Sequence, residues 1–151
     1  ISTSQPEVGL DANTEGGYKL IITGGNIVAI GGFESNASVS NGTSKSASSA
    51  SSYKGKWLGL YNGSTAAFAF KVPSNSSMGS SITVYTTGTP ALSSGVTGSG
   101  TAFWDGYGYS SFSGGSTVSL SSSTGGGGNQ PGGGNQPGGG NQPGGGGGGR
   151  P

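Results

Sequence analysis

The chain contains no cysteine and no histidine. Without cysteine there can be no disulfide framework, no thiolate metal site and no thiol catalysis. The absence of histidine removes the commonest general base and metal ligand from every candidate site. These two absences lead us to expect neither an enzyme nor a bound cofactor or metal.

Charge is also scarce, since charged residues make up 7% of the 151 residues and the formal net charge is +1. Nucleic-acid binding depends on clustered Lys and Arg side chains that displace phosphate counterions. Here the basic residues are scattered: Lys19, Lys45, Lys54, Lys56, Lys71 and Arg150. No apolar run approaches the roughly 20 residues of a membrane-spanning helix. We therefore expect no nucleic-acid partner and no membrane insertion.

Strong helix formers are sparse, whereas glycine, serine and threonine are abundant. Short apolar runs separated by turn residues predict an all-β body, a single β-sandwich of the jelly-roll or immunoglobulin-like kind. We expect strands at residues 18–23, 26–30, 54–61, 65–72, 82–86, 102–109 and 116–120. Gly24-Gly25 and Asn62-Gly63 predict hairpin turns. Residues 35–52 are expected to be a long loop with one weak strand near residues 37–39, and residues 91–100 a loop or a weak strand around Val96.

Residues 1–17 are predicted to form an extended arm in which Val8, Leu10 and Ala12 alternate as in a strand. An unpaired apolar strand folds back on its own sheet or completes the sheet of another subunit. We expect the second arrangement, with an acceptor groove lined by Ile21, Val28, Phe68 and Val84. Because the first residue is Ile1 and not Met, we also expect a processed chain.

The acidic residues form no pattern that indicates catalysis. A glycosidase needs two carboxylates across a cleft, and the spacing of Glu7, Glu15, Glu34 and Asp105 pairs none of them. Asp11 to Glu15 places oxygen ligands at alternate positions, as at the start of a calcium loop. The segment lacks the closing glutamate of such a loop, so a solvated turn is the preferred interpretation and calcium the alternative.

The aromatic residues are concentrated between Phe103 and Tyr109. Trp104, Asp105 and Tyr107 could form a sugar-binding platform, in which a ring stacks and the carboxylate accepts hydrogen bonds. A body with few aliphatic residues also needs aromatic volume, because each aromatic side chain buries about 150–250 Å². We favour a core or subunit contact over a sugar site.

Four Asn-x-Ser/Thr sequons make Asn36, Asn41, Asn62 and Asn75 candidate glycosylation sites. Residues 125–151 repeat Gly-Gly-Gly-Asn-Gln-Pro, a period equal to two turns of a polyproline II helix. A tail of this composition is a flexible tether or an ordered segment packed against neighbouring copies. We expect the ordered, polyproline-II-like form.

With this arm, this Ser/Thr/Gly/Asn-rich β body and several sequons, the chain resembles secreted microbial filament subunits of the strand-donating kind. These include the thread and bundling-pilus subunits of archaea. The resemblance covers the chain to about Thr124 and implies a sandwich whose missing strand comes from a neighbour, with the arm as donor. The Gly-Asn-Gln-Pro tail departs from that pattern.

The sequence thus predicts an arm (1–17), a β-sandwich body (18–124) and a repeat tail (125–151). The expected function is a structural, self-assembling subunit of an extracellular or cell-surface filament, with glycans as further partners. One alternative is a carbohydrate-binding or adhesive module on a glycine-rich tether, and another is a phage or virus fibre protein.

Overall fold

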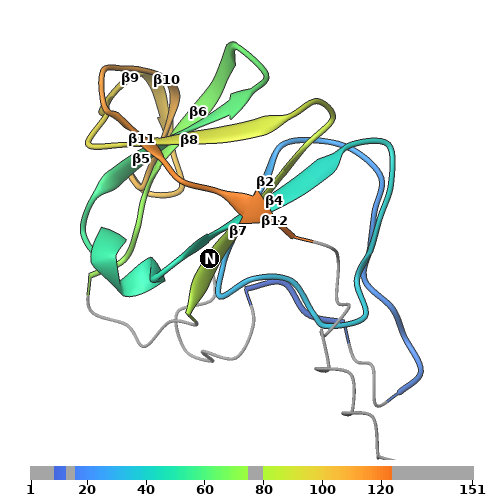
Figure 1. The fold of residues 1–151 in the computed structure, drawn as a ribbon. Coiled ribbons are helices and arrows are strands. Elements are labelled where there is room, and N and C mark those ends of the chain that lie inside the picture. Colours follow the sequence, from blue (N-terminus) through green and yellow to red (C-terminus); the bar gives the residue numbers. More distant parts are fainter. Residues whose placement is uncertain (1–8, 13–15, 75–79, 124–151) are drawn as a thin grey trace, which may run out of the picture.

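The computed structural model describes residues 9–12, 16–74 and 80–123. Within these ranges the chain forms β-strands and one short 3-10 helix (Ala50–Tyr53) but no α-helix, which confirms the all-β prediction (Figure 1). The predictions for Val8, for Asn75 and for the repeat tail lie outside the described residues.

Two antiparallel sheets make up most of the body (Figure 1). The four-stranded sheet has the order β12 (Ser121–Ser122), β4 (Thr43–Ser48), β7 (Ser81–Thr86), β2 (Ile27–Ile30). The six-stranded sheet has the order β11 (Ser116–Val118), β8 (Pro90–Ser94), β5 (Trp57–Asn62), β6 (Thr65–Lys71), β10 (Gly108–Ser113), β9 (Thr97–Phe103). The sheets pack against each other, as in a β-sandwich.

The main core lies between the two sheets. The side chains of alternate strand residues meet there, as the two-residue period of a strand requires. Its fully buried members include Leu58, Leu60, Phe70, Val72, Ile82, Val84 and Leu92. Burying each of these large apolar side chains stabilises the fold by about 1.5–3 kcal/mol.

A second, smaller core covers the opposite face of the six-stranded sheet. Phe112 of β10 packs there with Ala69 and Val96, and its ring lies 4.9 Å from that of Tyr61. Gly59 makes this approach possible, because a Cβ at Gly59 would collide with the Phe112 ring. The hairpin of β9 and β10 therefore folds back over the sheet that it extends.

The predicted hairpin at Gly24-Gly25 is wrong. β1 (Ile21–Ile22) pairs in parallel with β3 (Ser38–Val39), whereas β2 pairs with β7. In register with β7, β2 places Val28 and Ile30 against the core between the sheets. Pairing with β1, of which Ile21 is exposed and Ile22 buried, would bury less apolar surface.

The two loop predictions are only partly right. The weak strand expected near Val39 is present as β3, but β4 also lies within residues 35–52, and β8 and β9 occupy part of residues 91–100. In β4 small hydroxyl side chains take the place of apolar ones: Ser44 donates to the Ser123 carbonyl at 2.6 Å, and the Ser46 and Thr83 hydroxyls lie 2.7 Å apart. In β8, Leu92 is buried in the core. Pro90 stands at the first residue of β8, where a missing N–H is tolerated.

The hairpin predicted at Asn62-Gly63 is confirmed, because β5 and β6 pair across it with Asn62 opposite Thr65. Gly63 is the first of the two loop residues and has a φ of 63°. Glycine at this position is typical of a type II′ turn.

Candidate functional site

The outer edge of β2 directs backbone groups away from its own sheet. Gly31 N donates to Ser81 O at 2.8 Å, so by the alternation of an antiparallel ladder Ile27 and Ala29 also direct their groups towards β7. Val28 and Ile30 then direct their N–H and C=O groups outwards. Within the described ranges no strand pairs with that side of β2. Such a row of groups can accept a further strand.

This edge differs from the other ends of the two sheets. β12 and β11 are only two and three residues long and contain Ser, Thr and one Val. β9 is rich in Gly, Ser and Thr, and a register irregularity interrupts its pairing with β10. The edge strand β2, in contrast, has the sequence Ile-Val-Ala-Ile, with no charge, no proline and no irregularity in its pairing.

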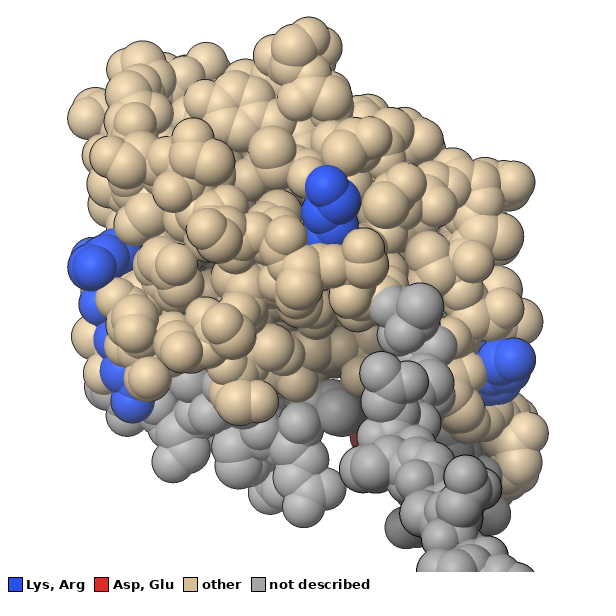
Figure 2. Space-filling view, in the orientation of Figure 1, with Lys and Arg blue, Asp and Glu red and all other residues tan. Residues whose placement is uncertain are grey.

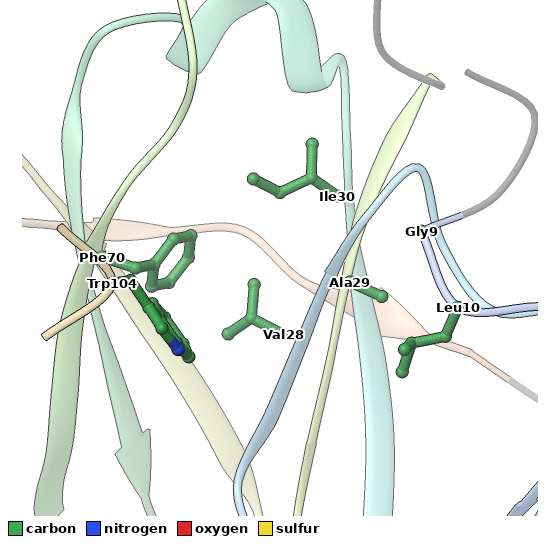
Figure 3. Close-up of a pocket in the computed structure, with 7 residues that line it drawn as sticks. All are labelled: Gly9, Leu10, Val28, Ala29, Ile30, Phe70 and Trp104. Atoms are coloured by element: carbon green, nitrogen blue, oxygen red, sulfur yellow. The ribbon is translucent and has the colours of Figure 1, made fainter. Parts of the chain in front are cut away.

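An apolar groove of about 160 Å³ runs beside the β2 edge (Figure 3). Both sheets, the arm and the turn between β9 and β10 contribute to it. Its lining residues are Gly9, Leu10, Val28, Ala29, Ile30, Phe70 and Trp104. In the close-up the Phe70 and Trp104 rings lie side by side and face Val28. The groove therefore opens where the apolar interior reaches the outer edge of β2.

Trp104 forms an aromatic wall of this groove. Its ring lies 4.7 Å from Phe103 and 5.6 Å from Phe68, in edge-to-face arrangements that favour both pairs. Even so, 49% of Trp104 is exposed. The wall is thus held in place by its neighbours, and a strand lying in the groove could bury more of it.

Trp104 also begins the turn that joins β9 to β10. Tyr107 N donates to Trp104 O at 3.0 Å, and the central residues Asp105 and Gly106 have φ values of 52° and 83°. Two positive φ angles are typical of a type I′ turn, for which Asp-Gly is a preferred pair. The predicted strand over 102–109 is therefore wrong, and Asp105-Gly106 was the signal that sequence reasoning missed.

The arm lies at one end of the groove and contacts its own chain. Leu10 forms a parallel bridge with Phe33. Gly9 N and Leu10 N both donate to Gly32 O, at 2.8 and 3.1 Å, and Glu34 N donates to Leu10 O at 2.9 Å. Of the predicted donor residues, Leu10 thus lines a groove of its own chain and Ala12 is half-buried.

The bridge brings two carboxyl groups together. A hydrogen bond with the Asp11 side chain is the largest of the effects that lower the pKa of Glu34. The Ser35 N–H and hydroxyl each donate to Glu34 Oε1 at 3.0 Å and lower this pKa further. The contact joins a residue of the arm to a residue of the body.

The four residues that were expected to line an acceptor groove do not all lie together. Val28 lines the groove, and Phe68 supports it through Trp104. Val84 is completely buried in the core, and Ile21 is 65% exposed on β1, so neither lines the groove. Ile30 and Phe70 were missed, although Ile30 follows Val28 at the two-residue spacing of one strand face.

The residues of the sugar-binding alternative share one turn. Trp104, Asp105 and Tyr107 are all exposed there, and Tyr107 is 44% accessible. The structure places them close in the chain but leaves Asp105 outside the apolar groove.

The described sequons differ in how free their side chains are. Asn36 and Asn41 are exposed. Asn62 Nδ2 donates to Thr87 Oγ1 at 3.0 Å, and its Oδ1 accepts from Gly88 N at 2.8 Å. A glycan on Asn62 would break the first of these bonds, so Asn36 and Asn41 are the better acceptors.

No match was found when the chain was compared with known protein families, with curated proteins and with solved structures. In the part of the chain that the structure describes, no three acidic side chains gather into a group that could hold a metal ion. No helix within the described ranges is long and apolar enough to cross a membrane.

Proposed function

We propose that this chain is a structural subunit of an extracellular filament or surface assembly that polymerises by β-strand addition between copies. Its body is a single β-sandwich that carries an extended arm (1–17) and a glycine-rich tail (125–151). The arm residues Val8, Leu10 and Ala12 supply the strand, and the β2 edge with its groove accepts it.

The outer edge of β2 is the observation that carries this proposal, because no strand of the described ranges pairs with it. Proteins protect exposed sheet edges with Lys, Pro or bulges, because a bare apolar edge pairs with other chains. The Ile-Val-Ala-Ile sequence of β2 has none of these devices and borders an apolar groove. An edge of this kind suits a protein in which pairing between chains is the function.

The surface chemistry is compatible with a neutral, self-associating subunit. Figure 2 shows a face with few blue Lys side chains, which form no broad patch, and with almost no acidic surface. Contacts made by main-chain hydrogen bonds and apolar burial need no charge complementarity. The exposed Asn36 and Asn41 would be accessible to glycosylation in a secreted protein.

Electron microscopy of the purified chain tests the proposal from the donor side. We expect uniform filaments from the wild type, and only single particles from Leu10→Asp and from a chain without residues 1–17. Tyr18→Asp is the matched control, since Tyr18 is 67% exposed and does not line the groove. A wild type that stays monomeric under all conditions would contradict the proposal.

The exposed turn residues support a second candidate, a contact with neutral saccharides. Tyr107 offers a half-exposed ring, and the neighbouring Asp105 carboxylate is an acceptor for sugar hydroxyls. Retarded migration in polysaccharide gels, lost in Tyr107→Ala and in Asp105→Ala, would support it. Neither residue lines the groove, so both variants should still form filaments.

A further inference from the structure

We infer that the segment Gly9–Ala12 is an exchangeable strand, which occupies its own docking site in the isolated subunit and the same site of a second copy in an assembly. The docking site is the segment Gly32–Glu34 together with the adjoining end of β2. This inference rests on the proposed function. It identifies the partner at the docking site as a second copy of this chain.

Within the described ranges, few backbone contacts hold the segment in its own chain, and none of them is made to the core between the sheets. Among the described residues, three backbone hydrogen bonds hold the segment: two to Gly32 O and one from Glu34 N. Leu10 makes the single bridge, with Phe33. By comparison, β4 and β7 pair over six residues each. The arm segment can therefore detach while the sandwich stays folded.

The docking site and the outer edge of β2 form one continuous surface. Gly9 lies so close to Ile30 that a Cβ would meet the Ile30 carbonyl oxygen at 2.5 Å. Ile30 is one of the two β2 residues whose backbone groups point away from β7. A chain that docks beside Gly32–Glu34 thus arrives at the β2 edge, and Leu10 reaches the groove that Val28 and Trp104 also line.

The connection between arm and body is able to open. After the bridge, the next strand in the described ranges is β1, which has two residues and pairs with the two residues of β3. Tyr18 and Ile21 on this stretch are 67% and 65% exposed. Ile22 of β1 is buried, but neither it nor the arm belongs to the main core cluster between the sheets, so releasing residues 9–12 leaves that cluster in place.

Each contact that the arm loses on leaving its own body is made again between two copies. An identical segment of a second copy can make the same hydrogen bonds and the same Leu10 contacts, so the two arrangements differ mainly in chain entropy. Concentration then decides between them, because only the exchanged form is favoured by mass action. The docked arm would act as a cap that delays assembly in dilute solution.

The absence of native cysteine makes the inference directly testable by disulfide trapping. Neighbouring strands lie about 4.8 Å apart, within the range of Cα separations that a disulfide spans. The probes are the double variant Leu10→Cys/Phe33→Cys and a mixture of the two single variants. A mixture of Leu10→Cys with Ser64→Cys is the control, because Ser64 lies in the exposed turn between β5 and β6 and forms no bridge with Leu10.

We expect the dilute, oxidised double variant to form a disulfide within one chain, seen by mass spectrometry. Filaments grown from the mixed single variants under reducing conditions and then oxidised should contain covalent heterodimers, and the control mixture should not. In the dilute double variant, the disulfide should prevent filament growth until a reductant is added.

Other results would overturn the inference in distinguishable ways. Filaments without heterodimers would refute exchange at this site but leave the filament function standing. A dilute double variant that forms no internal disulfide would refute docking within one chain. If the single variants grow no filaments, NMR of wild-type filaments mixed from ¹³C-labelled and ¹⁵N-labelled chains answers the same question. Only exchange brings Leu10 of a chain with one label into contact with Phe33 of a chain with the other label. Failure of the wild type to form any filament would instead refute the proposed function.

Discussion

Gly59 is the residue on which the second core depends. It stands between Leu58 and Leu60, both buried on the opposite face, and leaves room for the Phe112 ring. A sequence pattern cannot reveal this role, because it depends on a strand that folds back from far along the chain. The glycine in an otherwise apolar strand is nevertheless a sign of close approach by another group.

Gly59→Ala should therefore lower the free energy of unfolding by about 1–3 kcal/mol, the usual cost of overpacking a core. The measurement is chemical denaturation followed by fluorescence. Gly24→Ala is the matched control, since nothing lies near a Cβ at Gly24 and its φ is not positive. Its unfolding free energy should change by less than about 0.5 kcal/mol. Equal effects in the two variants would refute the role of Gly59.

Asp11→Ala should raise the pKa of Glu34 towards its ordinary value of 4.5, because the Asp11 hydrogen bond is the largest of the effects that lower it. Ser35→Ala removes only the weaker hydroxyl donor and should raise this pKa less. NMR titration of the Glu34 carboxyl carbon measures both shifts. An unchanged pKa in Asp11→Ala would mean that the arm does not dock beside Glu34.

The sign of the pH effect follows from this direction. A carboxyl group with a lowered pKa in the folded state stabilises the fold above its unfolded pKa, and this contribution is lost as the pH falls through the folded pKa. The contribution of Glu34, measured as the stability lost in Glu34→Gln, should accordingly be fully present above about pH 4.5 and should disappear only once the pH falls below the lowered folded-state pKa of Glu34.

Among the elements, β2 and β4 show what the sequence could and could not predict. The apolar run of β2 was sufficient to predict a strand, but its partner depends on the burial that β7 offers. The Ser-rich β4 has almost no apolar signal, because hydroxyl pairs and one buried alanine satisfy its environment. Its place inside the sheet depends on contacts with residues far along the chain.

The orientation of the β2 backbone makes a prediction about proline. Ala29→Pro removes an N–H that points to β7 and leaves a buried partner unpaired, so it should cost about 1–3 kcal/mol of stability. Val28→Pro removes an outward N–H and should cost little beyond the lost packing, which Val28→Ala measures. Thermal unfolding compares the three variants. If the proline in Val28→Pro lowered the stability more than the proline in Ala29→Pro, the N–H of Val28 and not that of Ala29 would point to β7. That result would contradict the assigned edge.

At the scale of the whole molecule, the scarcity of charge predicts how the assembly responds to salt. Ion pairs between exposed groups are screened strongly at 1 M ionic strength, where the Debye length is about 3 Å. Strand addition and apolar burial are not weakened in this way. Filaments should thus persist unchanged by light scattering between about 0.05 and 1 M NaCl. Dissolution at high salt would indicate an interface made by charges.

The candidate site combines features that the sequence predicts with features that only the fold creates. The alternating arm and the apolar β2 strand can be identified from the sequence alone. The groove cannot be identified in this way, because it depends on Phe70 and on the turn between β9 and β10, which directs Trp104 towards Val28. Residues from both sheets and from the arm become neighbours there only when the two sheets pack.

A helical reconstruction of the filament by electron cryo-microscopy tests the central claim most directly, since it shows what covers the β2 edge. The account predicts a strand from a second copy about 4.8 Å from β2, hydrogen-bonded to Val28 and Ile30, with an apolar side chain against Trp104. A filament in which this edge faces solvent would contradict it.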